Sequence, residues 1–153
     1  MLMTSGLTTG SKRVFLDTAP IIYFLDNHKL YGEKMALIID ELLKSEIAMV
    51  SSVITAEEYL VYPLRMKSQK AVDAFFRFHN DYEIPLVPVS LEIAEKAADI
   101  RAVYTHFKSM DALQLASALM MKCDLFLTND KRLKQFRELP CIIVDEWPIH
   151  EEL

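Results

Sequence analysis

The chain has 153 residues, of which 52% are hydrophobic and 25% charged, a composition that suits one folded domain and excludes a mainly disordered protein. The chain has 22 acidic residues and 17 Lys and Arg, so its net charge is −5. An overall positive charge therefore cannot be the basis for binding a nucleic acid. A metal ion could still bridge an acidic protein to a phosphate.

The sequence predicts a cytoplasmic protein without membrane association. Residues 1–12 are small and polar and lack the apolar centre of a signal peptide, and the longest apolar stretch, 112–121, is too short to cross a bilayer. Residues 6–12 superficially resemble a phosphate-binding loop, but the glycine spacing is one residue short and no strand precedes it, so we interpret 1–12 as a tail. Cys123 and Cys141 are too few for a disulfide framework and are expected to be buried free thiols.

Short apolar runs alternate with helical patterns along the chain. Strands are expected at 14–16, 47–50, 85–89, 125–127 and 142–144. Helices are expected from near Pro20, over 33–45, from Ser52 or Thr55 towards Met66, and over 69–82, 91–104, 110–121 and 131–136. Pro63 should kink or end its helix early, and Ser109 should be an N-cap. The alternation predicts an α/β fold, a three-layer α/β/α sandwich around a central parallel sheet of about five short strands.

Acidic residues stand where the predicted strands end or the following helices begin. Asp17 directly follows the first strand, Asp130 follows the fourth, Asp111 opens a helix, and Glu57 or Glu58 follows the second strand. Ligands of open parallel sheets bind at the carboxyl ends of the strands, so we expect these carboxylates to share one crevice. Clustered carboxylates repel one another unless a cation or raised pKa values relieve them, and carboxylate oxygens are ligands that Mg²⁺ and Mn²⁺ prefer.

Each acid also has a purely structural interpretation. Asp111 suits the first turn of any helix, Asp130 could cap the helix that starts at Lys131, and Glu57 and Glu58 could both be solvated. Asp17 is the hardest to explain in this way, because a helix beginning near Pro20 would lie too far away for it to be the N-cap. The set of four, more than any single member, predicts a metal site.

Other candidate residues give weaker signals. Lys108, Lys131 and Arg132 lie near the predicted acid cluster and could contact a nucleic-acid backbone, although solvated surface charge explains them as well. The four histidines lack metal-ligand spacing. Phe75, Phe76 and Phe78 have helical spacing and are expected in the core or in a dimer contact.

Four segments, in order, resemble the signature blocks of PIN-domain nucleases, most closely the toxins of VapBC-type toxin–antitoxin pairs. The segments are VFLDT (14–18), SVITAEEY (52–59), SMDALQLA (109–116) and FLTND (126–130). The resemblance extends over most of the chain and implies a PIN-like nuclease domain at 13–147, followed by a short tail at 148–153.

The resemblance implies which residues form the site. Asp17, Glu58, Asp111 and Asp130 match the acidic quartet that holds Mg²⁺ or Mn²⁺, and the motif, not the helical periodicity, selects Glu58 over Glu57. The matching supporting positions are Thr18, Thr128 and Asn129.

The implied activity is metal-dependent hydrolysis of RNA phosphodiester bonds, by a homodimeric toxin that a cognate antitoxin inhibits. An arginine of the antitoxin could pair with the carboxylates. The alternatives are a PIN nuclease of RNA maturation or decay, a receiver-like signalling module and a catalytically silent binding module. The receiver needs a second acid at the end of the first strand, where only Asp17 is present.

Overall fold

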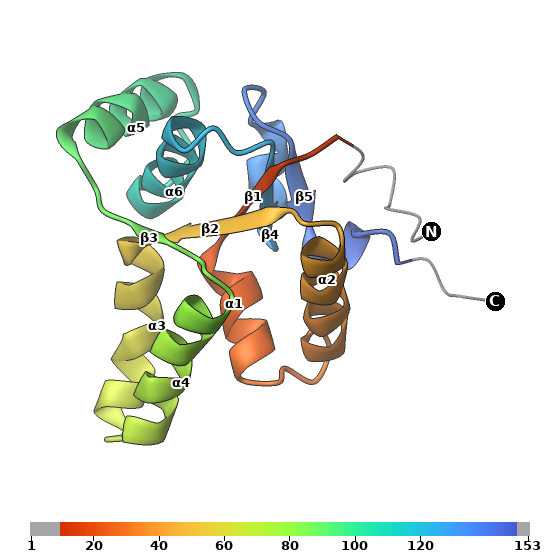
Figure 1. Ribbon diagram of the computed structural model, residues 1–153. Coiled ribbons are helices and arrows are strands. Elements are labelled where there is room, and N and C mark those ends of the chain that lie inside the picture. Colours follow the sequence, from red (N-terminus) through yellow and green to blue (C-terminus); the bar gives the residue numbers. More distant parts are fainter. Residues whose placement is uncertain (1–9, 150–153) are drawn as a thin grey trace.

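A parallel five-stranded sheet forms the centre of the computed structural model, which describes residues 10–149 (Figure 1). The strands are β1 (Arg13–Leu16), β2 (Ala48–Ser52), β3 (Leu86–Val87), β4 (Leu125–Thr128) and β5 (Cys141–Ile143), in the spatial order β3-β2-β1-β4-β5. All four strand pairings are parallel, as expected. Strand β3 is shorter than predicted because Pro85 and Pro88 flank it and neither has an N–H to donate to a neighbouring strand.

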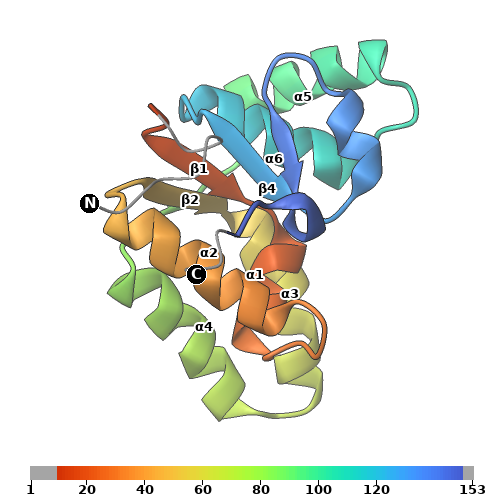
Figure 2. The same cartoon turned by 90° about the vertical axis from the view of Figure 1, so that its right-hand side faces the viewer.

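Helices cover both faces of the sheet, which confirms the predicted three-layer sandwich. One face carries α1 (Thr18–Leu25), α2 (Gly32–Lys44), α3 (Val53–Arg65) and α4 (Gln69–Asp81), and the other carries α5 (Leu91–Val103) and α6 (Ser109–Met120) (Figures 1 and 2). Two short 3₁₀ helices, η1 (Lys131–Gln135) and η2 (Val144–Glu146), follow β4 and β5. Within residues 10–149, no helix is both long and apolar enough to cross a lipid bilayer.

The chain leaves the middle of the sheet in both directions, and this creates its switch point. From β1 it proceeds outward through β2 to β3, then returns through α5 and α6 to β4 on the other side of β1. Strands β1 and β4 are therefore neighbours, with Leu16 opposite Leu127. The two strands that precede Asp17 and Asp130 thus end side by side.

Alternate residues of the central strands fill two separate cores. Val14 and Leu16 of β1 pack with the core beneath α1–α4, whereas Phe15 faces the core beneath α5 and α6. The Phe15 ring stacks on Phe126 of β4, with centroids 5.2 Å apart and planes 4° from parallel. This stacked pair links β1 to β4 directly behind the edge where Asp17 and Asp130 lie.

Three helix boundaries differ from the predictions. Helix α1 begins at Thr18, not near Pro20, and Asp17 is its N-cap, with Oδ1 accepting from the Thr18 N–H at 2.9 Å. Helix α6 begins at Ser109 itself, so Lys108 and not Ser109 occupies the N-cap position. Helix α3 continues past Pro63 to Arg65, because proline removes one hydrogen bond while Met66 N still donates to the Tyr62 carbonyl at 2.9 Å.

The remaining structural predictions hold in part. Cys123 and Cys141 are buried free thiols, and burial raises the pKa of each to about 12. Phe75 and Phe78 are core residues, but Phe76 is 50% exposed. The segment expected to be helical at 131–136 is a 3₁₀ helix. Residues 1–9 and 150–153 lie outside the described part, and with them the ends of both expected tails, most of the rejected phosphate-loop segment and His150.

The stacked pair makes a stability prediction. Phe126→Ala removes a fully buried ring and its partner contact, so the free energy of unfolding should fall by about 3–5 kcal/mol. Urea unfolding followed by circular dichroism measures this loss. Phe76→Ala, at a half-exposed position, is the matched control and should cost about 1 kcal/mol or less; equal losses in the two variants would contradict the assigned core.

Candidate active site

A cavity of about 470 Å³ opens at the carboxyl edge of the sheet, and all four candidate acids line it. Asp17 ends β1, Asp130 follows β4, Glu58 lies in the second turn of α3, and Asp111 lies in the first turn of α6. Because parallel strands all end at this edge and α3 starts directly from β2, the fold collects these side chains from distant parts of the sequence.

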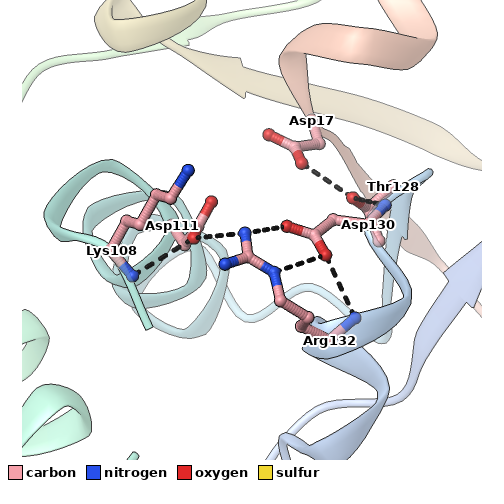
Figure 3. Close-up of polar contacts among 6 residues, drawn as sticks. All are labelled: Asp17, Lys108, Asp111, Thr128, Asp130 and Arg132. Carbon is pink, nitrogen blue, oxygen red and sulfur yellow. Dashed lines mark hydrogen bonds and ion pairs between the residues drawn. The ribbon is translucent and has the colours of Figure 1, made fainter. Parts of the chain in front are cut away.

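Asp17 is held in place by two hydrogen bonds. The Thr128 hydroxyl donates to Oδ2 at 2.8 Å (Figure 3). The Thr18 N–H donates to Oδ1. Burial raises the pKa of Asp17 from 3.8 to about 6, the two hydrogen bonds oppose the rise, and the charges of Asp111 and Glu58 add to it. Asp17 therefore binds a proton unusually well unless a positive charge is nearby.

Glu58, rather than Glu57, faces the cavity. Its Oε1 accepts from the Thr18 hydroxyl at 3.0 Å, whereas Glu57 is not among the residues that line the cavity. Burial raises the pKa of Glu58, the Thr18 hydrogen bond lowers it, and the neighbouring charges of Glu57 and Asp111 raise it further.

Asp111 and Asp130 both interact with the side chain of Arg132. The Arg132 guanidinium donates from Nε to Asp130 Oδ1 at 3.0 Å, and its Nη2 lies 3.6 Å from Asp111 Oδ2 (Figure 3). Hydrogen bonding from Arg132 is the main cause that holds the pKa of Asp130 below its usual value. Asp130 also caps η1, since its Oδ1 accepts from the Arg132 N–H at 3.0 Å. Arg132 thus lies between the two carboxylates.

The other predicted residues take distinct places around the cavity. Thr128 links two acids, because its oxygen also accepts from the Asp130 N–H at 3.1 Å. Asn129 lines the cavity and donates to the Tyr23 hydroxyl at 3.0 Å. Lys131 lines the cavity as well. Lys108 is exposed, its N–H donates to Asp111 Oδ2 at 3.3 Å, and its charge contributes to the lowered pKa of Asp130.

Several residues at this edge were not predicted. Gln114, Thr55 and Ser52 form a buried hydrogen-bonded group beneath the acids, and Tyr23 and Met110 line the cavity. A signal for Gln114 is present in the sequence. It is a polar residue on the apolar face of α6, three residues after Asp111 and therefore on the same side of the helix.

The donor set suits a hard divalent cation. The four charged groups offer only carboxylate oxygens. Burial, with a smaller contribution from the charges of Asp111 and Glu58, raises the pKa of Asp17, so a nearby cation would stabilise its ionised form. Among the residues that the structure describes, no three acidic, histidine or cysteine side chains converge closely enough to surround an ion by themselves. One or two carboxylates completed by water, the usual arrangement for Mg²⁺, fit this edge.

A protein-family model named PIN domain matches residues 14–139, which include all four acids and every strand of the sheet except β5 and the first residue of β1. The chain belongs to the PIN domain family. Membership of this family excludes the receiver-like alternative. Comparison of the sequence with curated proteins finds no significant match.

Several solved structures resemble this PIN domain along most of its length. A chain of the VapBC2 complex from Rickettsia felis, crystallised with a promoter DNA fragment, has a TM-score of 0.69 at 14% identity, with 86% of this chain and 98% of that chain covered. A chain of FitAcB from Neisseria gonorrhoeae has a TM-score of 0.62 at 17% identity, with 84% and 95% covered.

VapC20 from Mycobacterium tuberculosis, a toxin that cleaves the sarcin–ricin loop, has a TM-score of 0.59 at 16% identity, with 83% and 98% covered. At these identities the likeness concerns the fold, and it agrees with the α/β sandwich described above.

Burial of Asp17 makes the stability of this PIN domain depend on pH. The folded protein binds the Asp17 proton more tightly than the unfolded chain does, since the pKa rises from 3.8 to about 6. The stabilisation that proton binding by Asp17 gives the folded state is therefore complete below about pH 4 and is lost as the pH rises through about 6. This loss lowers the free energy of unfolding by about 1–3 kcal/mol.

The measurement is urea unfolding between pH 4 and pH 7.5 in chelator, for the wild type and Asp17→Asn. The asparagine does not titrate, so the difference in unfolding free energy between the two proteins should fall across this window. Parallel pH curves would contradict the assigned environment of Asp17.

Proposed function

We propose that this protein is a divalent-metal-dependent endoribonuclease, with residues 13–147 as its nuclease domain, and the toxin of a toxin–antitoxin pair. The observation that carries the proposal is the meeting of Asp17, Glu58, Asp111 and Asp130 in one cavity at the carboxyl edge of the sheet. VapC20, a toxin of similar fold, cleaves an RNA loop, which supports RNA as the substrate.

In this proposal Mg²⁺ or Mn²⁺ is the cofactor, held by the four carboxylates directly or through water. A divalent ion at this place supplies polarisation of the phosphoryl oxygens and activation of the attacking water. The chain's own part is to keep the carboxylates ionised and oriented, and two threonine hydroxyls do so by donating to them. Thr128 donates to Asp17, and Thr18 donates to Glu58.

Basic residues beside the cavity account for how an acidic protein holds RNA. Lys131 lines the cavity, and the exposed side chains of Lys108 and Arg132 lie near its acids. Phosphate contacts of this kind position a strand without reading its bases, and they weaken as salt increases. Asn129, which also lines the cavity, can donate to the same strand.

The proposed protein partners are a second copy of the chain and a cognate antitoxin. The contact between Arg132 and the acids shows that a guanidinium fits between Asp111 and Asp130. An arginine brought by an antitoxin would make the same charge-assisted hydrogen bonds and exclude the substrate. Size-exclusion chromatography with light scattering tests the homodimer, and titration with the product of any adjacent small gene tests the antitoxin.

The nuclease proposal is tested with labelled structured and single-stranded RNAs, incubated with Mg²⁺, Mn²⁺ or chelator. Cleavage should require the divalent ion. Asp17→Asn and Asp111→Asn should each lower the rate by about 100-fold or more, because electrostatic stabilisation of the transition state is of this size.

Contaminating ribonuclease is the chief artefact of this experiment, so the variants are purified in parallel as its control. Cleavage that survives in both variants would be contamination. Failure of the wild type to cleave any RNA, together with failure to bind Mn²⁺ in calorimetry, would overturn the proposal and favour a binding module.

Arg132 makes a separate prediction about metal binding. The guanidinium and a divalent ion compete for Asp111 and Asp130, so Arg132→Gln should bind Mn²⁺ roughly two- to fivefold more tightly at low salt. Lys131→Gln removes the same charge from a neighbouring position that has no ion pair to these acids in the described structure, and should change the affinity less. Equal changes in the two variants would mean that only net charge matters.

A further inference from the structure

A continuous chain of side-chain hydrogen bonds runs beneath the cavity to Glu58. Ser52 Oγ donates to Gln114 Oε1, and Gln114 Nε2 donates to Thr55 Oγ1 at 2.9 Å and to Thr18 Oγ1 at 3.4 Å. The Thr55 and Thr18 hydroxyl oxygens lie 3.0 Å apart, and Thr18 Oγ1 lies 3.0 Å from Glu58 Oε1. Except for Glu58, the members are at most 6% exposed, so water does not replace these bonds.

The proton positions in this chain follow from donor and acceptor counting. The ionised Glu58 carboxylate can only accept, so the Thr18 hydroxyl hydrogen points to it. Thr18 must then accept from Thr55, whose own oxygen accepts from the amide of Gln114. At the other end, Ser52 Oγ accepts from the Ile54 N–H, and its hydrogen goes to the Gln114 carbonyl. Every donor in the chain therefore points towards Glu58.

Gln114 is the member that fixes this direction. A hydroxyl can rotate and exchange its roles as donor and acceptor, whereas an amide has separate donor and acceptor ends. With the Gln114 carbonyl held by Ser52, its NH₂ group must face the two threonines. An apolar side chain at this position would leave Thr55 without its donor and free the threonine hydroxyls to rotate.

The buried chain also connects the elements that carry three of the acids. Thr18 directly follows Asp17, Thr55 precedes Glu58 by three residues in α3, and Gln114 follows Asp111 by three residues in α6. Residues three apart lie on the same side of a helix. The hydrogen-bonded residues thus form a buried layer directly beneath the carboxylates, with one member next to each of the three.

We propose that Gln114 is a positioning residue for the metal site, which acts through Thr55 and Thr18 to orient the Glu58 carboxylate towards the cavity. The inference rests on the proposed function, because it takes Glu58 as one of the groups that hold the divalent ion. It adds a cavity-lining residue whose amide is engaged by Ser52, Thr55 and Thr18, and it predicts that the effect of Gln114 passes through one particular carboxylate.

The test measures Mn²⁺ binding by calorimetry in a double-mutant cycle, with no substrate present. Gln114→Met, which has a similar volume and no amide, should weaken Mn²⁺ binding about tenfold, as loss of a group that orients a metal ligand typically does. In the Glu58→Gln background the same substitution should change the affinity by less than about twofold, because the carboxylate through which it acts is gone. Equal weakening in both backgrounds, or no weakening in either, would overturn the proposal.

Two further variants separate positioning from general loss of stability. Thr55→Val breaks the same chain at the next member and should reproduce the effect of Gln114→Met, without adding to it in the double variant; an additive or absent effect contradicts the relay. Ser117→Ala removes a buried hydroxyl from the same helix, one that donates to the Leu113 carbonyl at 2.7 Å and not to the site. This control should leave Mn²⁺ binding unchanged, and weakening equal to that of Gln114→Met would overturn the proposal.

The outcomes also separate this inference from the proposed function. Absence of Mn²⁺ binding by the wild type, or wild-type affinity in Glu58→Gln, would refute the acidic metal site itself, and the inference with it. Weaker binding in Glu58→Gln but not in Gln114→Met would leave the metal site intact and refute only the role of Gln114.

Discussion

The pairing of β1 with β4 is the constraint on which the site depends. Leu16 lies opposite Leu127, the Asp17 N–H continues the ladder by donating to the Leu127 carbonyl at 2.9 Å, and Thr128 reaches back to the Asp17 carboxylate. This register brings the ends of two strands, more than a hundred residues apart in the chain, to the same edge. Helices α3 and α6 also begin at this edge, and the fold therefore gathers four carboxylates where like charges repel.

The protein relieves that repulsion only in part. Hydroxyl and backbone donors hold Asp17 and Glu58, and the Arg132 guanidinium lies between Asp111 and Asp130. The pKa values of Asp17 and Glu58 stay raised, mainly because both carboxyls are buried and in smaller part because neighbouring carboxylates repel them, so a proton or a cation would stabilise each of them. A site that is costly to charge and rich in oxygen donors is the physical basis for the proposed divalent ion, and the donor chain through Gln114 is the part of the protein that keeps Glu58 facing it.

Much of this could be predicted from the sequence, because the strands are short apolar runs and the acids directly follow them. The parallel sheet, the three layers and the meeting of acids at one edge followed from the alternation of strands and helices, whereas the choice of Glu58 over Glu57 needed the family motif. The predicted start of α1 near Pro20 is wrong. Proline is typical of the first helical turn, but here it is the third residue of the helix, which Asp17 caps and which begins at Thr18. Asp17 can cap the helix and also line the cavity, because its two carboxylate oxygens have different partners. Oδ1 accepts from the Thr18 N–H, and Oδ2 accepts from the Thr128 hydroxyl.

Tertiary contacts account for what the sequence did not predict. Gln114, Thr55 and Ser52 come from three separate places in the chain, so no local pattern indicates that their side chains meet. The position of Arg132 between two acids likewise depends on how η1 leaves β4. Helix α3 could pass Pro63 because the following residues close their own hydrogen bonds, a compensation that a local rule for proline does not include.

The most direct test of the central claim is the anomalous scattering of Mn²⁺ in crystals of this protein grown with the ion. The account predicts a peak inside the cavity, within direct or water-bridged reach of Asp17 and at least one other of the four acids. A peak only at carboxylates elsewhere on the surface, or no peak at a saturating concentration of Mn²⁺, would contradict the claim that this edge of the sheet is a metal-dependent active site.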